Sequence, residues 1–205
     1  RCLNLAAKNA GDGLSMLSAI ENATNDVTDM LQRMRELAVQ AGSGTYSATD
    51  RDALDLEFQA LMSEITRIAK NTEWNGSTIL DGNSVFTSNA TKQTKAIQIG
   101  TSASQSMSIE FNSWVPTVQH AEEVTAAEGT NYAALDVNAN GTNDGAFGTA
   151  VLYWGGSDGT LDGAFIDIDT AANASWAITQ LDAAINGAAA ERAKYGAYMS
   201  RLGHA

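Results

Sequence analysis

One apolar pattern runs through about the first forty residues of this 205-residue chain and closes on Leu31–Gln40. Apolar side chains recur every three or four positions, with a shift of one at Ile20, which is typical of one face of an α-helix. Such a helix would be roughly 60 Å long, too long for the core of a small domain. The pattern therefore predicts a rod of several long helices, in which this helix ends at Gly42–Gly44. Its inward residues are predicted to be Leu3, Ala7, Ala10, Leu14, Leu17, Ile20, Val27, Met30, Leu31, Met34, Ala38 and Ala41.

Two further helices are predicted to complete the rod. Ser47 is expected to cap the second helix together with Asp50, three residues later, and the turn Asn75–Gly76 follows its end. The third helix fills the end of the chain, where Arg192 is the one polar member of the apolar stripe. We expect Arg192 to pair with a carboxylate of the first two helices or to contact a neighbouring subunit. The stripes are Leu54, Phe58, Leu61, Ile65 and Ile68, and Ile178, Leu181, Ile185, Ala188, Tyr195, Met199 and Leu202.

Between the helices the pattern changes to alternation. Lys95–Gly100 and Met107–Phe111 read as the two strands of a hairpin. The chain is then rich in Gly, Asn, Asp and Ala up to about residue 170, with short alternating pieces at Ala150–Trp154 and Phe165–Asp169. We read this stretch as a small β-rich insertion that projects from the rod.

The predicted fold class is α+β. It is an elongated rod of three long helices, two N-terminal and one C-terminal, with a β-hairpin and a small β-rich insertion domain. The predicted divisions are residues 1–112 for the N-terminal half of the rod, 113–170 for the outer domain and 171–205 for the C-terminal helix.

Charge is unevenly distributed along the chain. The net charge is −12, yet no Lys or Arg lies between Lys95 and Arg192. Such an acidic middle should repel nucleic acid and anionic membranes, and we expect neither as a partner. Cys2 is the one cysteine, which excludes an internal disulfide framework. The chain contains no apolar run that could cross a bilayer and no signal segment, and we expect both ends to be cut from a longer protein.

One segment of the predicted insertion resembles a calcium loop. Oxygen-bearing side chains and a glycine, Gly141, follow the order of the first half of such a loop, but Phe147 stands where the last acid belongs. A plain turn rich in Asn and Asp is the favoured interpretation, and weak Ca²⁺ binding is the alternative; no cofactor is required. The candidate ligands are Asp136, Asn138, Asn140, Thr142 and Asp144.

Catalytic chemistry has little support in the sequence. The two histidines, His120 and His204, are far apart, and His120 does not begin a zinc-protease motif. We therefore expect a protein that is not an enzyme. The alternative to a purely structural role is a cell-surface adhesin whose insertion binds a glycan by aromatic stacking, although a packed core is the favoured role for these aromatic residues. They are Trp114, Tyr132, Tyr153 and Trp154.

Several ordered motifs of the predicted rod resemble bacterial flagellin. The resemblance covers about residues 1–112 and 173–205, which is all but the insertion. Asn71–Gly76 carries Trp where the family more often has Phe, and Cys2 is a second departure. The motifs are Arg1–Gly13, Leu31–Gln40, Asn71–Gly76, Ile97–Gly100 with Ser106–Ile109, and Leu181–Leu202.

This resemblance implies an extracellular structural subunit that polymerises with itself into the filament used for swimming. It also implies export through the flagellar export apparatus with a chaperone. The terminal segments that form the innermost core of the filament are not in this sequence, so we expect the fragment to be monomeric. A hook–filament junction protein, which shares the long terminal helices, is a further alternative.

The resemblance also implies a contact site on the rod helices. In many flagellins an Arg and a Leu of the first helix and a Glu of the second form a patch that the flagellin-sensing Toll-like receptor recognises. Those positions are Arg33, Leu37 and Glu57 here, with Gln32 and Gln40 beside them. Arg33, Leu37 and Gln40 are spaced so as to share one helical face. We expect this face to contact a neighbouring subunit as well as the receptor.

Overall fold

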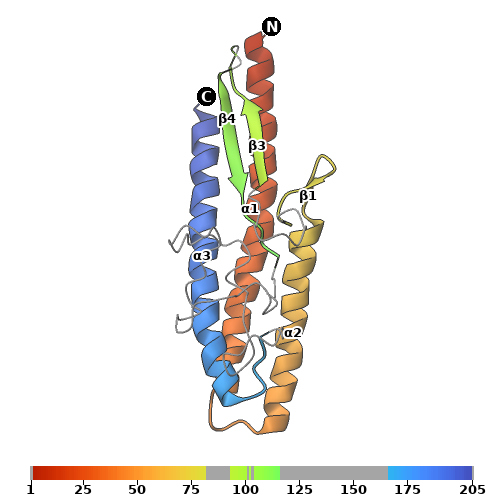
Figure 1. Ribbon diagram of the computed structural model, residues 1–205, viewed down its shortest axis with the longest axis vertical. Helices are drawn as coiled ribbons and strands as arrows, with labels where there is room; N and C mark the ends of the chain where they lie inside the picture. The colour runs from red at the N-terminus through yellow and green to blue at the C-terminus, as the bar shows by residue number, and fades with distance from the viewer. Residues whose placement is uncertain (1, 82–92, 101, 103, 116–165, 205) are drawn as a thin grey trace, which may run out of the picture.

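The computed structural model describes residues 2–81, 93–100, 102, 104–115 and 166–204 (Figure 1). Three helices lie side by side along the long axis of a rod. α1 spans Cys2–Ala41, α2 spans Ala48–Asn71 and α3 spans Ala171–Gly203. β1, Glu73–Trp74, pairs with β2, Ser77–Thr78, and β3, Gln93–Gln98, pairs with β4, Ser106–Phe111, both antiparallel. The predicted α+β rod of three long helices with a hairpin is confirmed.

α1 is a single helix of 40 residues that packs against both of the other helices. Its end is fixed by Arg51 of α2, whose guanidinium donates from Nε to the Ala41 carbonyl at 2.7 Å and from Nη2 to the Ser43 carbonyl at 3.0 Å. A cation at this position stabilises the carbonyl end of a helix. The predicted stop after Ala41 is therefore confirmed, with a side-chain cap that the pattern did not show.

The capping box predicted at the start of α2 is present. The Ser47 hydroxyl accepts from the Asp50 backbone N–H at 3.3 Å, and the Asp50 carboxylate accepts from the Ser47 N–H at 3.0 Å. The Ser47 hydroxyl also donates to Asp50 Oδ2 at 2.7 Å, and this bond, together with the bond from the Ser47 N–H, holds the pKa of Asp50 below its usual value. At the other end of α2 the chain reverses at Asn75 and Gly76, whose φ angles are 50° and 77°. Two positive φ angles are typical of the tight hairpin turn that the Asn-Gly pair predicted.

The hairpin of β3 and β4 lies along α1 and α3 in the upper part of the view (Figure 1). Met107, Ile109 and Phe111 of β4 alternate inward and are buried. Gly13 of α1 allows this close packing, because a Cβ at this residue would lie 3.1 Å from Leu202 Cδ1 and closer still to the end of the Ile97 side chain. The predicted hairpin is confirmed, with boundaries that differ by one or two residues.

Both ends of the predicted insertion belong to the rod core. Trp114 is 1% exposed, and its backbone N–H donates to the Leu80 carbonyl at 2.8 Å. Ile166 and Ile168 are buried beside α2, and the Ile168 N–H donates to Asp55 Oδ1 at 3.0 Å. The described part of the alternating piece Phe165–Asp169 is therefore an extended segment bound to a helix and not a β-strand. Residues 113–115 and 166–170, which the prediction placed in the insertion, pack with the rod.

Three details of the predicted helix faces differ from the structure. Ala7 is exposed, and the neighbouring residue Ala6 is buried in its place. Arg192 makes no ion pair with α1 or α2 among the described residues, and its Nε is buried without a hydrogen-bond partner. Leu3 lies where no side chain is described. In the described ranges none of the helices combines the length and apolar character that a membrane crossing requires.

Candidate contact surface on the rod

Arg33 and Glu57 meet across the outer edge of the α1–α2 pair. Arg33 Nε donates to Glu57 Oε1 at 2.8 Å, and Arg33 Nη1 donates to Glu36 Oε2 at 3.1 Å. The side chains of Arg33, Glu57 and Glu36 are 44%, 46% and 65% exposed. The bonds to Glu57 and then Glu36 raise the pKa of Arg33, so the guanidinium remains charged. The resemblance thus predicted two residues, 24 positions apart, that the fold brings together.

The connection between the helices determines this register. Residues 42–47 reverse the chain, and the bonds from Arg51 hold the start of α2 against the end of α1. From this fixed end the two helices run antiparallel, so residues near 33 and near 57 reach the same level (Figure 1).

Leu37 is not part of the exposed face, which corrects the prediction. It is 0% exposed, whereas Gln32 is exposed and Gln40 is partly exposed. Four residues on from Arg33 the helix has turned by about 40°. That rotation places Leu37 in the α1–α2 seam, where it packs in the core.

Two large apolar residues in this part of α1 and α2 are exposed, Val39 and Leu56, at 48% and 74%. Neither was predicted. Leu56 lies directly before Glu57 and does not belong to the apolar stripe that contains Leu54 and Phe58. This position outside the stripe could have predicted from the sequence that Leu56 is exposed.

A second arginine pair lies on the opposite flank of α1. Arg35 Nε donates to Asp182 Oδ1 of α3 at 2.5 Å, and the two side chains are 42% and 48% exposed. The hydrogen bond from Arg35 lowers the pKa of Asp182. Arg33 and Arg35 are therefore matched in geometry and exposure but face different helices.

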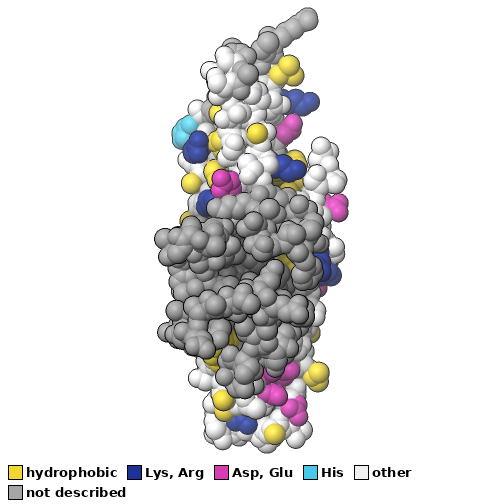
Figure 2. Space-filling model, in the orientation of Figure 1, with side chains coloured by type: hydrophobic (Ala, Val, Ile, Leu, Met, Phe, Trp, Pro, Cys, Tyr) yellow, Lys and Arg dark blue, Asp and Glu magenta, His cyan; other side chains and the backbone are white. Residues whose placement is uncertain are grey.

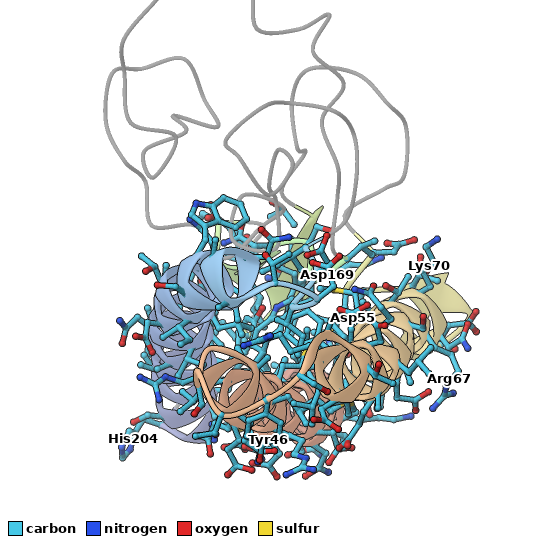
Figure 3. All side chains as sticks on the ribbon, turned by 90° about the horizontal axis from the view of Figure 1, so that it is seen from below. Tyr46, Asp55, Arg67, Lys70, Asp169 and His204 are labelled. Carbon is cyan, nitrogen blue, oxygen red and sulfur yellow. The ribbon has the colours of Figure 1, made fainter. Side chains whose placement is uncertain are left out.

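Acidic side chains gather near the lower end of the rod, where α2 begins (Figure 2). Asp55 and Asp169 lie next to each other in the view from that end (Figure 3). Asn173 Nδ2 donates to Asp167 Oδ1 at 2.5 Å and to Asp169 Oδ1 at 3.0 Å, and Gln59 Nε2 donates to the carbonyl of Ile166 at 2.7 Å. Burial, opposed by the Asn173 bond, raises the pKa of Asp167. The Gln59 bond fixes the returning chain to α2, and the Asn173 bonds fix it to the start of α3.

In the part of the chain that the structure describes, acids, histidines and cysteines form no group of three or more that could hold a metal ion. The candidate calcium loop, residues 136–144, lies outside the described residues, and Ca²⁺ binding stays a prediction. Trp114 is buried in the rod core, so its predicted role as an exposed stacking platform or as core of a separate small domain is wrong. Tyr132, Tyr153 and Trp154 lie outside the described residues.

Comparisons with known proteins agree with the rod. Residues 1–85 match the family profile of the bacterial flagellin N-terminal helical region. A flagellin of Clostridium tyrobutyricum is 31% identical over 98% of this chain and 71% of its own length. The chain belongs to the flagellin family.

A flagellin of Bacillus subtilis (strain 168) is 33% identical over 100% of the chain and 62% of its own length, so the chain spans less than two thirds of that relative. The crystal structure of Bacillus cereus flagellin superposes with a TM-score of 0.63 at 27% identity and covers 97% of this chain and 86% of that one. Flagellins are structural subunits of the extracellular flagellar filament and not an enzyme family. The predicted recognition, fold and filament role are confirmed at this level.

Proposed function

We propose that this flagellin contacts neighbouring copies in the filament through one exposed surface of the rod. This rod contact surface comprises Gln32, Arg33, Glu36 and Gln40 of α1 and Leu56 and Glu57 of α2. The single observation that carries the proposal is the exposed pair between Arg33 and Glu57, which joins two helices.

The pair holds the Arg33 guanidinium in a fixed direction at the surface. A fixed guanidinium loses less side-chain entropy when a partner binds, and a planar cation beside an apolar side chain is frequent among residues that dominate binding energies. Leu56, next to Glu57 and 74% exposed, supplies the apolar part. A contact between this surface and a different surface of the next copy can repeat from copy to copy, and where the rotation does not close into a ring it generates an open helical polymer.

The matched arginines provide the test. Arg33→Ala and Arg35→Ala would be introduced into the whole product of the gene, in cells without another flagellin. We expect Arg33→Ala to shorten filaments and slow swimming, and Arg35→Ala to leave both close to wild type. Equal effects of the two variants, with equal amounts of exported protein, would contradict the proposal. Circular dichroism of both proteins would confirm that each variant is folded.

We further propose that the flagellin-sensing Toll-like receptor recognises the same surface. Arg33 and Glu57 are exposed and fixed, and Gln32 extends the polar area along α1. Leu37 is excluded from direct contact by its burial. A receptor that recognises a surface needed for filament assembly meets a target that mutation cannot readily change.

The receptor proposal is tested with the soluble chain in a reporter-cell assay. Arg33→Ala and Glu57→Ala should each weaken activation, and Arg35→Ala and Asp182→Ala should not. If both Arg33→Ala and Glu57→Ala activate the reporter cells as strongly as wild type, the proposal that the receptor recognises this surface is wrong. Export through the flagellar apparatus with a chaperone remains a proposal from the family. No described contact favours the adhesin alternative.

A further inference from the structure

A charged side chain of α3 is buried beside the residues that follow β4. Glu191 of α3 is 6% exposed and is the one charged residue among the buried polar residues of the described ranges. Asn112 and Ser113, at the end of β4, are 5% and 7% exposed. Polar groups are thus concentrated at the root of the insertion, defined here as Asn112–Val115.

The Glu191 carboxylate is only partly satisfied. Asn112 Nδ2 donates to Glu191 Oε1 at 2.5 Å, and Lys194 Nζ lies 3.8 Å from the same oxygen. Glu191 Oε2 is buried without a hydrogen-bond partner. A buried ion depends on the groups that contact it, and for Glu191 these are Asn112, Lys194 and Tyr195, of which Asn112 makes the short hydrogen bond.

The same root contacts α3 one turn farther along. Trp114 Nε1 donates to the Tyr195 hydroxyl at 3.2 Å, and the Tyr195 ring lies 6.0 Å from that of Phe111. Burial and the nearby charge of Glu191 raise the pKa of Tyr195, so its phenol stays neutral. On its other side the Trp114 backbone N–H bonds the Leu80 carbonyl at 2.8 Å.

We propose that Asn112 and Glu191 form a buried latch, a two-state device that connects the root of the insertion to α3. In the closed state, seen here, Asn112 donates to the carboxylate. In the open state the root leaves α3 and Glu191 is hydrated. Hydration stabilises an ion that is buried in the closed state. The contact between Asn112–Val115 and α3 therefore opens more readily than a purely apolar contact would. Opening of Asn112–Val115 then changes the surroundings of Glu191 and Tyr195 on α3.

Three variants of the full chain test the latch. Asn112→Asp places two carboxylates at hydrogen-bond distance, so at neutral pH the closed state would require either a second buried charge or a proton shared between them; both cost free energy and should open the latch. Glu191→Gln keeps an acceptor for Asn112 and removes the buried charge, so it should favour the closed state. The double variant Asn112→Asp/Glu191→Gln restores one donor and one acceptor with exchanged roles and should close the latch again.

Hydrogen exchange at neutral pH measures the opening. The Trp114 N–H reports the root, and the Ile79 N–H, which bonds the Thr72 carbonyl at 3.1 Å, is the control. Asn112→Asp should accelerate exchange at Trp114 by roughly tenfold or more without changing Ile79. Exchange at Trp114 should slow in Glu191→Gln and return to the wild-type rate or below it in the double variant. Unchanged exchange in Asn112→Asp, no rescue in the double variant, or equal acceleration at both amides would overturn the latch.

Discussion

Arg33–Glu57 and Asn112–Glu191 are two polar contacts in the same rod with opposite surroundings. The first pair is nearly half exposed and both charges remain hydrated. In the second pair the residues are 5% and 6% exposed, and one carboxylate oxygen has no partner. An exposed ion pair contributes little to stability and stays available to another molecule, whereas a buried carboxylate depends on each of its contacts. Contact with partners is therefore expected at the first pair, and control of the fold at the second.

The largest expected effect concerns the buried region. Trp114→Ala should lower the free energy of unfolding by about 3–5 kcal/mol, because it leaves a cavity beside Tyr195. Urea denaturation measures the loss. Trp74→Ala, at a partly exposed tryptophan of β1, is the control and should cost less. A smaller loss for Trp114→Ala than for Trp74→Ala would show that the root of the insertion is not part of the rod core.

Two glycines of α1 compare its inner and outer faces directly. Gly11→Ala meets nothing within 4 Å and should stabilise the protein by about 1 kcal/mol, through helix propensity alone. In Gly13→Ala the same gain is opposed by crowding against Ile97 and Leu202, so the net result should be a loss of about 1 kcal/mol. Thermal unfolding of both variants measures the difference. Equal stabilisation by both substitutions would show that the hairpin adjusts freely to the added methyl group.

The capping box gives a smaller effect that depends on pH. Ser47→Ala should cost about 1 kcal/mol at neutral pH. The pKa of Asp50 is lowered in the folded state, mainly by Ser47. The contribution of Asp50 to the stability of the fold is therefore present above the pKa that Asp50 has in the unfolded chain. It is lost as the pH falls through the pKa that Asp50 has in the folded state. The difference in the free energy of unfolding between wild type and Ser47→Ala, measured by denaturation, should become smaller in acid. A difference that is constant with pH would contradict the role given to Asp50.

The smallest effects on stability are expected at the exposed pairs. Arg33→Ala and Arg35→Ala should each lower the free energy of unfolding only slightly, and added NaCl should reduce the loss. Urea denaturation of both variants at low and high salt is the measurement. A loss of several kcal/mol for Arg33→Ala would mean that this arginine serves the fold, and a defect in assembly could then not be assigned to a contact.

Local features could be predicted from the sequence because they depend on neighbouring residues. The capping box of Ser47, the stop after Ala41 and the turn at Asn75–Gly76 are of this kind. The pair of Arg33 and Glu57 entered only through the resemblance to flagellins.

Features that depend on the packing of distant segments were missed. Leu37 was assigned to the exposed face of Arg33 because residues four positions apart differ in direction by only about 40°, and only the packing of the other helices shows that this rotation buries Leu37. Asn112 and Glu191 are 79 positions apart, and neither lies in a motif that links them. Trp114 and Ile168 were placed in the insertion because the surrounding composition changes before the rod ends.

The most direct test of the rod contact surface is cryo-electron microscopy of filaments assembled from the whole product of the gene. The account predicts that Arg33 and Leu56 of one subunit lie against the rod of the next and lose most of their exposure there. Filaments in which both side chains remain exposed to solvent would contradict it.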